Sequence, residues 1–307
     1  MSQKTLRIAS RKSPLALWQA NFIRDAILRH HPKLHVELLP MTTSGDKFLK
    51  DKLQTLGGKG LFVKELEEAL LDRRADIAVH SMKDVPATCP DGLSLAAIYK
   101  RDNPFDALIC KTPIDSLRNL PLGATIGTTS LRRQSQLLAI RPDFKIKPLR
   151  GNIHTRLSKM QTDGLDAIVL AVAGLERMNM QDIITETLNA DVMLPACGQG
   201  ALGIECRSED EQVHRIIAPL HDKLSSTCVQ SERLVNAQLG GNCHVPLAVY
   251  CSPLPNGQLQ IRAKVASLDG VTIIEDSQQA YPEDALIMAE KCAISLLAKG
   301  AATLLAL

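Results

Sequence analysis

The sequence predicts an α/β protein that ends in a smaller α+β domain. Up to about residue 220, short apolar runs typical of buried strands, such as 6–9 and 76–79, alternate with amphipathic helical segments. After residue 225 the order changes to one helix, three strand-like segments of an antiparallel sheet and a last helix. A chain of 307 residues is long enough for two or three domains of ordinary size.

The same local plan occurs twice in the α/β part. A strand at 6–9 leads to Ser13, a good helix N-cap that is followed by proline, and then to a helix. A strand at 124–127 leads to a second cap at Ser130 and to a helix over 131–140. We therefore expect two domains of similar topology.

The remaining elements follow from the same periodicities. Further strands are expected at 35–41, 93–99, 106–110, 144–149, 166–172 and 203–206, and in the last domain at 247–251, 258–266 and 272–276. Further helices are expected from residue 61, around 154–156, and at 175–178, 182–188, 209–220, 225–239 and 282–299. The glycine-rich segment 194–203 is expected to return the chain to the first domain, which gives domains at 1–99 with 200–218, at 105–194 and at 222–307.

The composition argues against several classes of protein. The net charge of +3 is too small to indicate a nucleic-acid partner, and aromatic residues make up only 3% of the chain. No apolar run approaches the ~18–20 residues that span a membrane, and no signal-peptide core follows Met1, so we expect a cytoplasmic protein. The eight cysteines form no C-x-x-C pair, so neither a disulfide framework nor a structural metal site is expected.

The segment 76–86, D-I-A-V-H-S-M-K-D-V-P, contains the strongest candidate for a reactive group. Its apolar beginning reads as a buried strand, and the chain becomes polar immediately afterwards. Ligands of open α/β sheets bind just beyond the carboxyl ends of the strands. Lys83 and Asp84 are adjacent there, so they are poorly placed to pair with each other and well placed to face a ligand. We take Asp84 as the candidate acid; the alternative is a solvated loop in which Asp84 caps the next segment.

Arginines occur at the strand-to-helix junctions of both expected α/β domains, at Arg11, Arg132, Arg133, Arg150 and Arg156. Helix N-termini attract anions, and arginine binds carboxylates and phosphates in a bidentate manner. For any single arginine, a solvated helix start is a sufficient explanation. Their recurrence at each junction favours a ligand that carries several negative groups.

Cys243 lies in the segment G-G-N-C-H-V-P of the last domain. Free cysteines are most often small buried apolar residues. A thiol in a flexible turn can instead be accessible and form a covalent bond. A catalytic pair with His244 is not expected, because neighbouring residues of a strand point to opposite faces.

Five segments carry a resemblance to a known family. They are V-H-S-M-K-D-V-P at 79–86, G-T-T-S-L-R-R-Q at 127–134, R-G-N-I-H-T-R-L at 150–157, G-Q-G-A-L-G-I-E at 198–205 and C-H-V-P at 243–246. Together and in this order they closely resemble the porphobilinogen deaminase (hydroxymethylbilane synthase) family, and the likeness extends from Arg7 to the last helix.

The resemblance implies two domains with type II periplasmic-binding-protein topology around a cleft, and a third domain that carries the cysteine. It also implies a dipyrromethane cofactor, assembled from two substrate molecules and held by a thioether to Cys243. Four further porphobilinogens are then added head to tail, each with loss of ammonia, and hydrolysis releases linear hydroxymethylbilane. The family suggests a monomer that acts on a small molecule, without a nucleic-acid or membrane partner.

The resemblance also implies roles for individual residues. Asp84 would stabilise the positive charge that forms on the pyrroles and would move protons. The cofactor would be held by Ser81, Lys83, Thr129, Ser130, Arg132, Arg133 and Arg156. The incoming substrate would be bound by Arg11, Ser13, Gln19, Lys59, Phe62, Arg150, Gly151 and Gln199, with the segment 42–60 as a mobile lid.

The cysteine segment departs from the family pattern at two positions. The family usually has two glycines directly before the cysteine, whereas Asn242 intervenes here after Gly240 and Gly241. Asn tolerates a left-handed backbone better than other non-glycine residues, so attachment at Cys243 is still expected. His244 stands where the family commonly has glutamine.

The alternative function is a cytoplasmic carboxylate- or polyanion-binding protein without catalysis, which would also explain the arginines.

Overall fold

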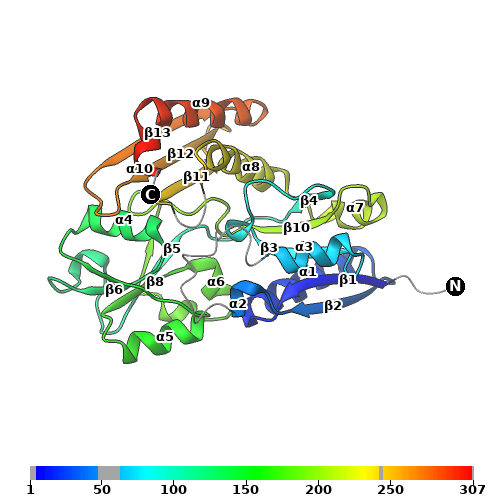
Figure 1. The fold of residues 1–307 in the computed structure, drawn as a ribbon, viewed down its shortest axis with the longest axis horizontal. Coiled ribbons are helices and arrows are strands. Elements are labelled where there is room, and N and C mark those ends of the chain that lie inside the picture. The colour runs from blue at the N-terminus through cyan, green and yellow to red at the C-terminus, as the bar shows by residue number, and fades with distance from the viewer. Residues whose placement is uncertain (1–4, 48–62, 242–244, 306–307) are drawn as a thin grey trace. The chain divides into compact units, whose positions relative to one another are not determined.

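The computed structural model describes residues 5–47, 63–241 and 245–305. Contacts between residues divide the chain into two compact units (Figure 1). Unit 1 comprises Met1–Asp102 and Ala201–Ser226, and unit 2 comprises Asn103–Gly200 and Thr227–Leu307. The limits of three separate domains stay a prediction.

Unit 1 contains a five-stranded sheet in the order β2-β1-β3-β10-β4. Its strands are β1 (Thr5–Arg11), β2 (His35–Met41), β3 (Ile77–Ser81), β4 (Leu93–Ile98) and β10 (Leu202–Arg207). β1 runs parallel to β2 and β3, whereas β10 is antiparallel to both β3 and β4. The chain therefore returns from unit 2 to insert β10 into the sheet of unit 1, as the sequence predicts for 203–206.

Helices cover both faces of this sheet (Figure 1). They are α1 (Pro14–His30), α2 (Ser44–Lys47), α3 (Lys64–Leu71) and α7 (Glu211–Ile217), with the short 3-10 turns η3 (Met82–Asp84) and η6 (Ala218–Leu220). The expected start of α1 is confirmed, because Ser13 caps it by accepting a hydrogen bond from the Ala16 amide at 3.3 Å. Ile23 and Ile27 of α1 are buried against one face of the sheet, and Leu66 and Leu70 of α3 are buried against the other.

Unit 2 contains a second five-stranded sheet in the order β7-β6-β8-β5-β9. Its strands are β5 (Asp106–Cys110), β6 (Thr125–Gly127), β7 (Lys145–Lys147), β8 (Ala167–Ala171) and β9 (Glu186–Leu188). β6 runs parallel to β7 and β8, and β5 is antiparallel to β8 and β9. In both sheets three neighbouring parallel strands are followed by an inserted antiparallel strand and by an edge strand that is antiparallel to the inserted one. This arrangement confirms the expected pair of periplasmic-binding-protein-like folds.

One expected helix of unit 2 is wrong. The helices here are α4 (Leu131–Ile140), α5 (Ile153–Thr162) and α6 (Val172–Arg177), with η4 (Leu117–Asn119) and η5 (Gln181–Ile183). The segment 182–188, expected to be helical, instead passes from η5 into β9, which pairs with β5. Thr185 and Thr187 are β-branched and suit a strand, and the Cys110 amide donates to Thr185 Oγ1 at 3.0 Å. Pairing at the sheet edge decides the conformation.

The third sheet, also in unit 2, is the antiparallel one that the sequence predicts. It consists of β11 (Leu247–Pro253), β12 (Leu259–Ala266) and β13 (Ile273–Ala280) in that order. It is covered by α8 (Lys223–Gln238), η7 (Pro282–Asp284), α9 (Ala285–Ala298) and α10 (Ala301–Leu305). Val249, Ile261, Met288 and Leu296 are among the buried residues of its own apolar core.

Candidate active site

In unit 1, Lys83 and Asp84 follow the carboxyl end of β3, where the sequence predicts them. Both lie in η3 and are half-buried. The preceding residue, Met82, is only 1% exposed, and its amide donates to the Ala201 carbonyl at 3.0 Å. The segment that carries the candidate acid is therefore anchored to the sheet immediately before Lys83.

The substrate-binding candidates Arg11, Ser13 and Gln19 lie near the same edge of the sheet. β1 and β3 are parallel neighbours, so their carboxyl ends meet at one edge. Arg11 is the last residue of β1, and Ser13 caps α1 directly after it. Gln19 on α1 is buried, and its Nε2 donates to Ser81 Oγ at 2.9 Å. The structure thus brings together these three residues and Ser81 within unit 1.

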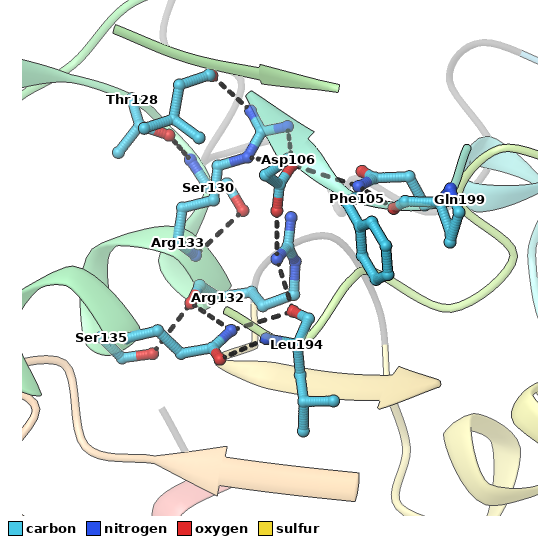
Figure 2. A network of polar contacts seen from close by, with 12 residues as sticks. Phe105, Asp106, Thr128, Ser130, Arg132, Arg133, Ser135, Leu194 and Gln199 are labelled. Carbon is cyan, nitrogen blue, oxygen red and sulfur yellow. Dashed lines mark hydrogen bonds and ion pairs between the residues drawn. The ribbon is translucent and has the colours of Figure 1, made fainter. Parts of the chain in front are cut away.

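Asp106 is the centre of a buried polar network in unit 2 (Figure 2). It is fully buried at the start of β5. Arg132 Nη1 donates to Asp106 Oδ2 at 2.8 Å. Arg133 donates to Oδ1 through Nε at 3.1 Å and through Nη2 at 2.6 Å. Gln199 Nε2 donates to the same Oδ1 at 3.1 Å and to the Pro104 carbonyl at 2.7 Å.

The charges of this network do not balance. Burial by itself would raise the pKa of Asp106, but Arg132 and Arg133 lower it by more, so the pKa lies well below its usual range. The carboxyl group is therefore ionised. Two guanidinium groups around one carboxylate leave one positive charge in excess. Arg132 uses Nη1 for both of its bonds, to Asp106 and to the Leu194 carbonyl.

Hydroxyl groups line the start of α4 at the end of β6. Ser130 is the N-cap, and its Oγ accepts from the Arg133 amide at 3.4 Å. Thr128 Oγ1 accepts from the Ser130 amide at 3.1 Å, and Thr129 Oγ1 donates to the Leu149 carbonyl at 3.3 Å. The predicted cap is confirmed, and it places Ser130 on the same helix turn as Arg132 and Arg133.

A second helix start in unit 2 holds Arg150, Gly151 and Arg156. Arg156 Nε donates back to the Gly151 carbonyl at 2.8 Å. Gly151 has φ 126°, a conformation that favours glycine. A Cβ at this position would lie 2.6 Å from Thr155 Cγ2, so a side chain is excluded by space as well. The turn that exposes the backbone between Arg150 and α5 thus requires glycine.

Sequence reasoning missed two charged residues of unit 2. Asp106 was expected only as the first residue of a strand, and it shares this place with Asp76 and Asp166, which also open apolar runs. Arg177 is 6% exposed at the end of α6, and its Nη2 donates to the Gly200 carbonyl at 2.7 Å. Its acceptor Gly200 belongs to the glycine-rich segment 194–203, and no periodicity of the sequence marks Arg177. Both are recognisable from their burial alone.

Three site candidates, Lys59, Phe62 and Cys243, lie outside the described residues, as does most of the expected lid at 42–60. Before Cys243 the described chain ends at Gly241. Gly240 has φ 62°, and the Gly241 amide donates to the Asn236 carbonyl at 2.7 Å. A Cβ on Gly241 would collide with Asn236 Oδ1. Both glycines are therefore required where α8 ends.

Comparison with known proteins identifies the family. Residues 6–215 match the profile described as porphobilinogen deaminase, dipyromethane cofactor binding domain, and residues 226–298 match porphobilinogen deaminase, C-terminal domain. This chain belongs to the porphobilinogen deaminase family. The porphobilinogen deaminase of Legionella pneumophila strain Lens is 60% identical over 305 residues, which are 99% of this chain and 98% of that protein. The protein of strain Philadelphia 1 is 58% identical over the same lengths.

Solved structures that are similar at low sequence identity include periplasmic binding proteins. The aliphatic sulphonate binding protein SsuA of Escherichia coli has a TM-score of 0.42 and 14% identity, with 77% of this chain and 71% of that chain covered. A TRAP solute binding protein of Desulfovibrio salexigens has a TM-score of 0.43 and 11% identity, with 72% and 73% covered. The fold assignment rests on the strand order given above.

Two negative findings apply to the described part of the chain. None of its helices has both the length and the apolar character needed to cross a membrane. No group of three or more His, Cys, Asp or Glu side chains in this part is placed to hold a metal ion.

Proposed function

We propose that this chain is a porphobilinogen deaminase in which Asp84 is the acid–base residue and Cys243 carries a dipyrromethane through a thioether. The family membership of the whole chain supports the reaction: four porphobilinogens are condensed head to tail into hydroxymethylbilane with release of ammonia. The observation that carries the role of Asp84 is its position, half-buried directly beyond the carboxyl end of β3.

Asp84 suits the charge changes of this reaction. Loss of ammonia from porphobilinogen leaves a cation, and formation of the new C–C bond leaves positive charge on a pyrrole until a proton departs. A carboxylate near the pyrrole N–H groups stabilises that charge and accepts or returns the proton. Asp84 is confined to one region by the buried Met82 before it, so little reorganisation is needed at each step.

The cationic residues suit the carboxylates of the pyrrole rings. Each ring carries an acetate and a propionate, so cofactor and product chain are polyanions. The donor set around α4 and α5 fits such a group, because Asp106 neutralises only one of the two buried charges of Arg132 and Arg133. Lys83, Ser81, Thr129, Ser130 and Arg156 complete the proposed cofactor-binding set. Arg11, Ser13, Gln19, Lys59, Phe62, Arg150, Gly151 and Gln199 form the proposed substrate-binding set.

The dipyrromethane, when bound, supplies the ring position at which chain growth starts. The chain's own contribution is to hold it at one place. Gly240 and Gly241 fix the exit from α8, and Val245 packs on the core of the third sheet. Cys243 stands between these two anchors in the sequence.

Intact-protein mass spectrometry tests the attachment. The wild-type protein should exceed its sequence mass by one dipyrromethane, and Cys243→Ser should lose both this excess and ammonia release. Cys89→Ser, a half-buried cysteine of unit 1, is the matched control and should keep both. Retention of the excess in Cys243→Ser, or full activity of a protein with no excess mass, would refute the thioether. An anion-binding protein without catalysis would show neither excess mass nor ammonia release.

We also propose that the protein is a cytoplasmic monomer, on the strength of the family and the sequence composition. Light scattering coupled to size-exclusion chromatography should give a mass near 33.5 kDa. A mass of twice this value at micromolar concentration would contradict the monomer.

A further inference from the structure

A buried group of ionisable side chains lies on the α3 face of the unit 1 sheet. His80 of β3 is 5% exposed and Glu205 of β10 is 1% exposed. His80 Nε2 lies 2.9 Å from Glu205 Oε2. The strand register pairs His80 with Gly203 and Glu205 with Ala78, so the two side chains meet diagonally across two antiparallel strands.

Glu67 of α3 is the third member of this group. α3 packs against both β3 and β10, and Glu67 is half-buried. Burial, and next the negative charge of Glu205, raise the pKa of Glu67 to about 7, against a smaller opposite effect of His80. Glu67 therefore changes its charge near neutral pH.

The group is directly connected to the segment that carries Asp84. His80 lies opposite Gly203 of β10 in the strand register, and Met82 opens η3 two residues later. Met82 lies over the same Gly203, since a Cβ on Gly203 would collide with Met82 Sδ. His80 and Met82 therefore both contact β10, and Lys83 and Asp84 follow directly in the chain.

Glu205 is an unusual residue for a purely structural role. Its Oε1 is buried and has no hydrogen-bond partner among the described residues. Buried polar atoms without partners are rare in proteins, and those that persist call for an explanation. Because the proposed reaction develops positive charge near Asp84, buried negative charge behind this residue would favour the transition state.

We propose that Glu67, His80 and Glu205 form a positioning cluster, which holds the end of β3 on β10 and places negative charge behind Asp84. This inference rests on the proposed role of Asp84. The chain from His80 to Asp84 spans at most about 14 Å. A unit charge at such a distance, at an effective dielectric constant of about 20, changes a rate by two- to tenfold.

Other ionisable residues lie on the elements packed around the cluster. They are Lys64, Glu65 and Glu68 on α3, Arg7 and Arg11 on β1, Cys206 and Arg207 on β10, and Asp76, Lys83 and Asp84 next to β3; β4 has none. Glu65 accepts from the Ser44 amide, and Arg207 donates to Asp210. Arg7 pairs with Asp76. Glu67 has a pKa raised to about 7.

The test compares kcat of wild type and Glu67→Gln between pH 6 and 8.5. Below pH 7 both proteins carry an uncharged side chain at position 67, so their kcat values should agree. Above pH 7 the wild type gains a negative charge that glutamine cannot supply, and its kcat should exceed that of the variant by two- to tenfold, with KM unchanged. Glu68→Gln, an exposed neighbour on α3, is the matched control and should follow the wild type throughout.

Parallel pH profiles for wild type and Glu67→Gln would overturn the inference. Glu205→Gln provides a second test, since it should lower kcat at every pH with little change in KM; a normal kcat would also overturn it. Asp84→Asn separates this inference from the proposed function. An active Asp84→Asn protein refutes the proposed acid, whereas an inactive one combined with parallel profiles refutes the cluster alone.

Discussion

Replacement of Asp106 by asparagine is the sharpest test of the buried network in unit 2. The substitution keeps the shape of the side chain and removes its charge. Asp106 accepts four side-chain hydrogen bonds, from Arg132, Arg133 and Gln199. The asparagine amide would present its NH₂ to one of these donors, and both guanidinium groups would stay buried without a counter-charge.

The expected loss of stability is large. Removing one partner of a buried ion pair typically costs about 3–5 kcal/mol, because the remaining charge is left in a medium of low dielectric constant. For a folded region of ~150–250 residues, about 1 kcal/mol shifts the melting temperature by ~2–4 °C. Asp106→Asn should therefore lower the melting temperature of the network's unit by roughly 6–20 °C.

Thermal and urea unfolding at pH 7 measure this effect. Asp191→Asn is the matched control, because Asp191 also pairs with an arginine of unit 2, Arg262 at 2.8 Å, but is exposed. Exposed pairs contribute only ~0–1 kcal/mol. A free energy of unfolding of Asp106→Asn within about 1 kcal/mol of that of Asp191→Asn would show that the network does not stabilise unit 2.

The pH dependence of the same variant provides a check of sign. The pKa of Asp106 is lowered in the fold, so its stabilisation is present above the ordinary carboxyl pKa of about 4 and is lost as the pH falls through the lower, folded value. The stability difference between wild type and Asp106→Asn should therefore be full at pH 5–7 and shrink below about pH 4. A difference that grows on acidification would contradict the assignment.

The other predictions concern catalysis and one turn. Asp84→Asn should lower kcat about 10²–10⁴-fold in an ammonia-release assay while its melting temperature stays near that of the wild type; near-normal turnover would remove Asp84 from the mechanism. Gly151→Ala should weaken substrate binding and lower the melting temperature, since a Cβ would press on Thr155. Gly164→Ala, with a positive φ but open space, is its control, and equal effects of both changes would show that backbone strain alone matters.

Local patterns in the sequence were sufficient for most of the elements. The cap and proline at Ser13 and Pro14 set the start of α1, and the bounds of α4 at Leu131–Ile140 follow from its apolar spacing and Ser130. The repeated order of strand, cap and helix indicated two similar sheets. These features depend on residues within one or two turns of each other, so they can be read without knowledge of the fold.

Local patterns gave a wrong or incomplete prediction where pairing with a strand distant in sequence determines the structure. Segment 182–188 forms no helix because β9 pairs with β5 at the edge of the sheet. β5 lies about 80 residues earlier in the chain. Helix propensity is a weak preference that such contacts override. In the sequence, Asp106 is likewise only the first residue of a strand. Its role as a counter-charge follows from the fold, because β5 runs antiparallel beside β8 and Arg132 of α4 donates to Asp106.

The sequence by itself determined the family, the repeated α/β plan and the position of Asp84 beyond β3, because motifs and strand ends are local properties of the chain. Only the tertiary structure decided that Arg132 and Arg133 share Asp106 as a counter-charge and that His80 meets Glu205 from a strand 125 residues away. Such pairs form when the inserted strands β5 and β10 run antiparallel between neighbours that are distant in sequence. The free energy of a buried charge depends on the groups that surround it in space, and the order of residues in the sequence does not show which groups these are.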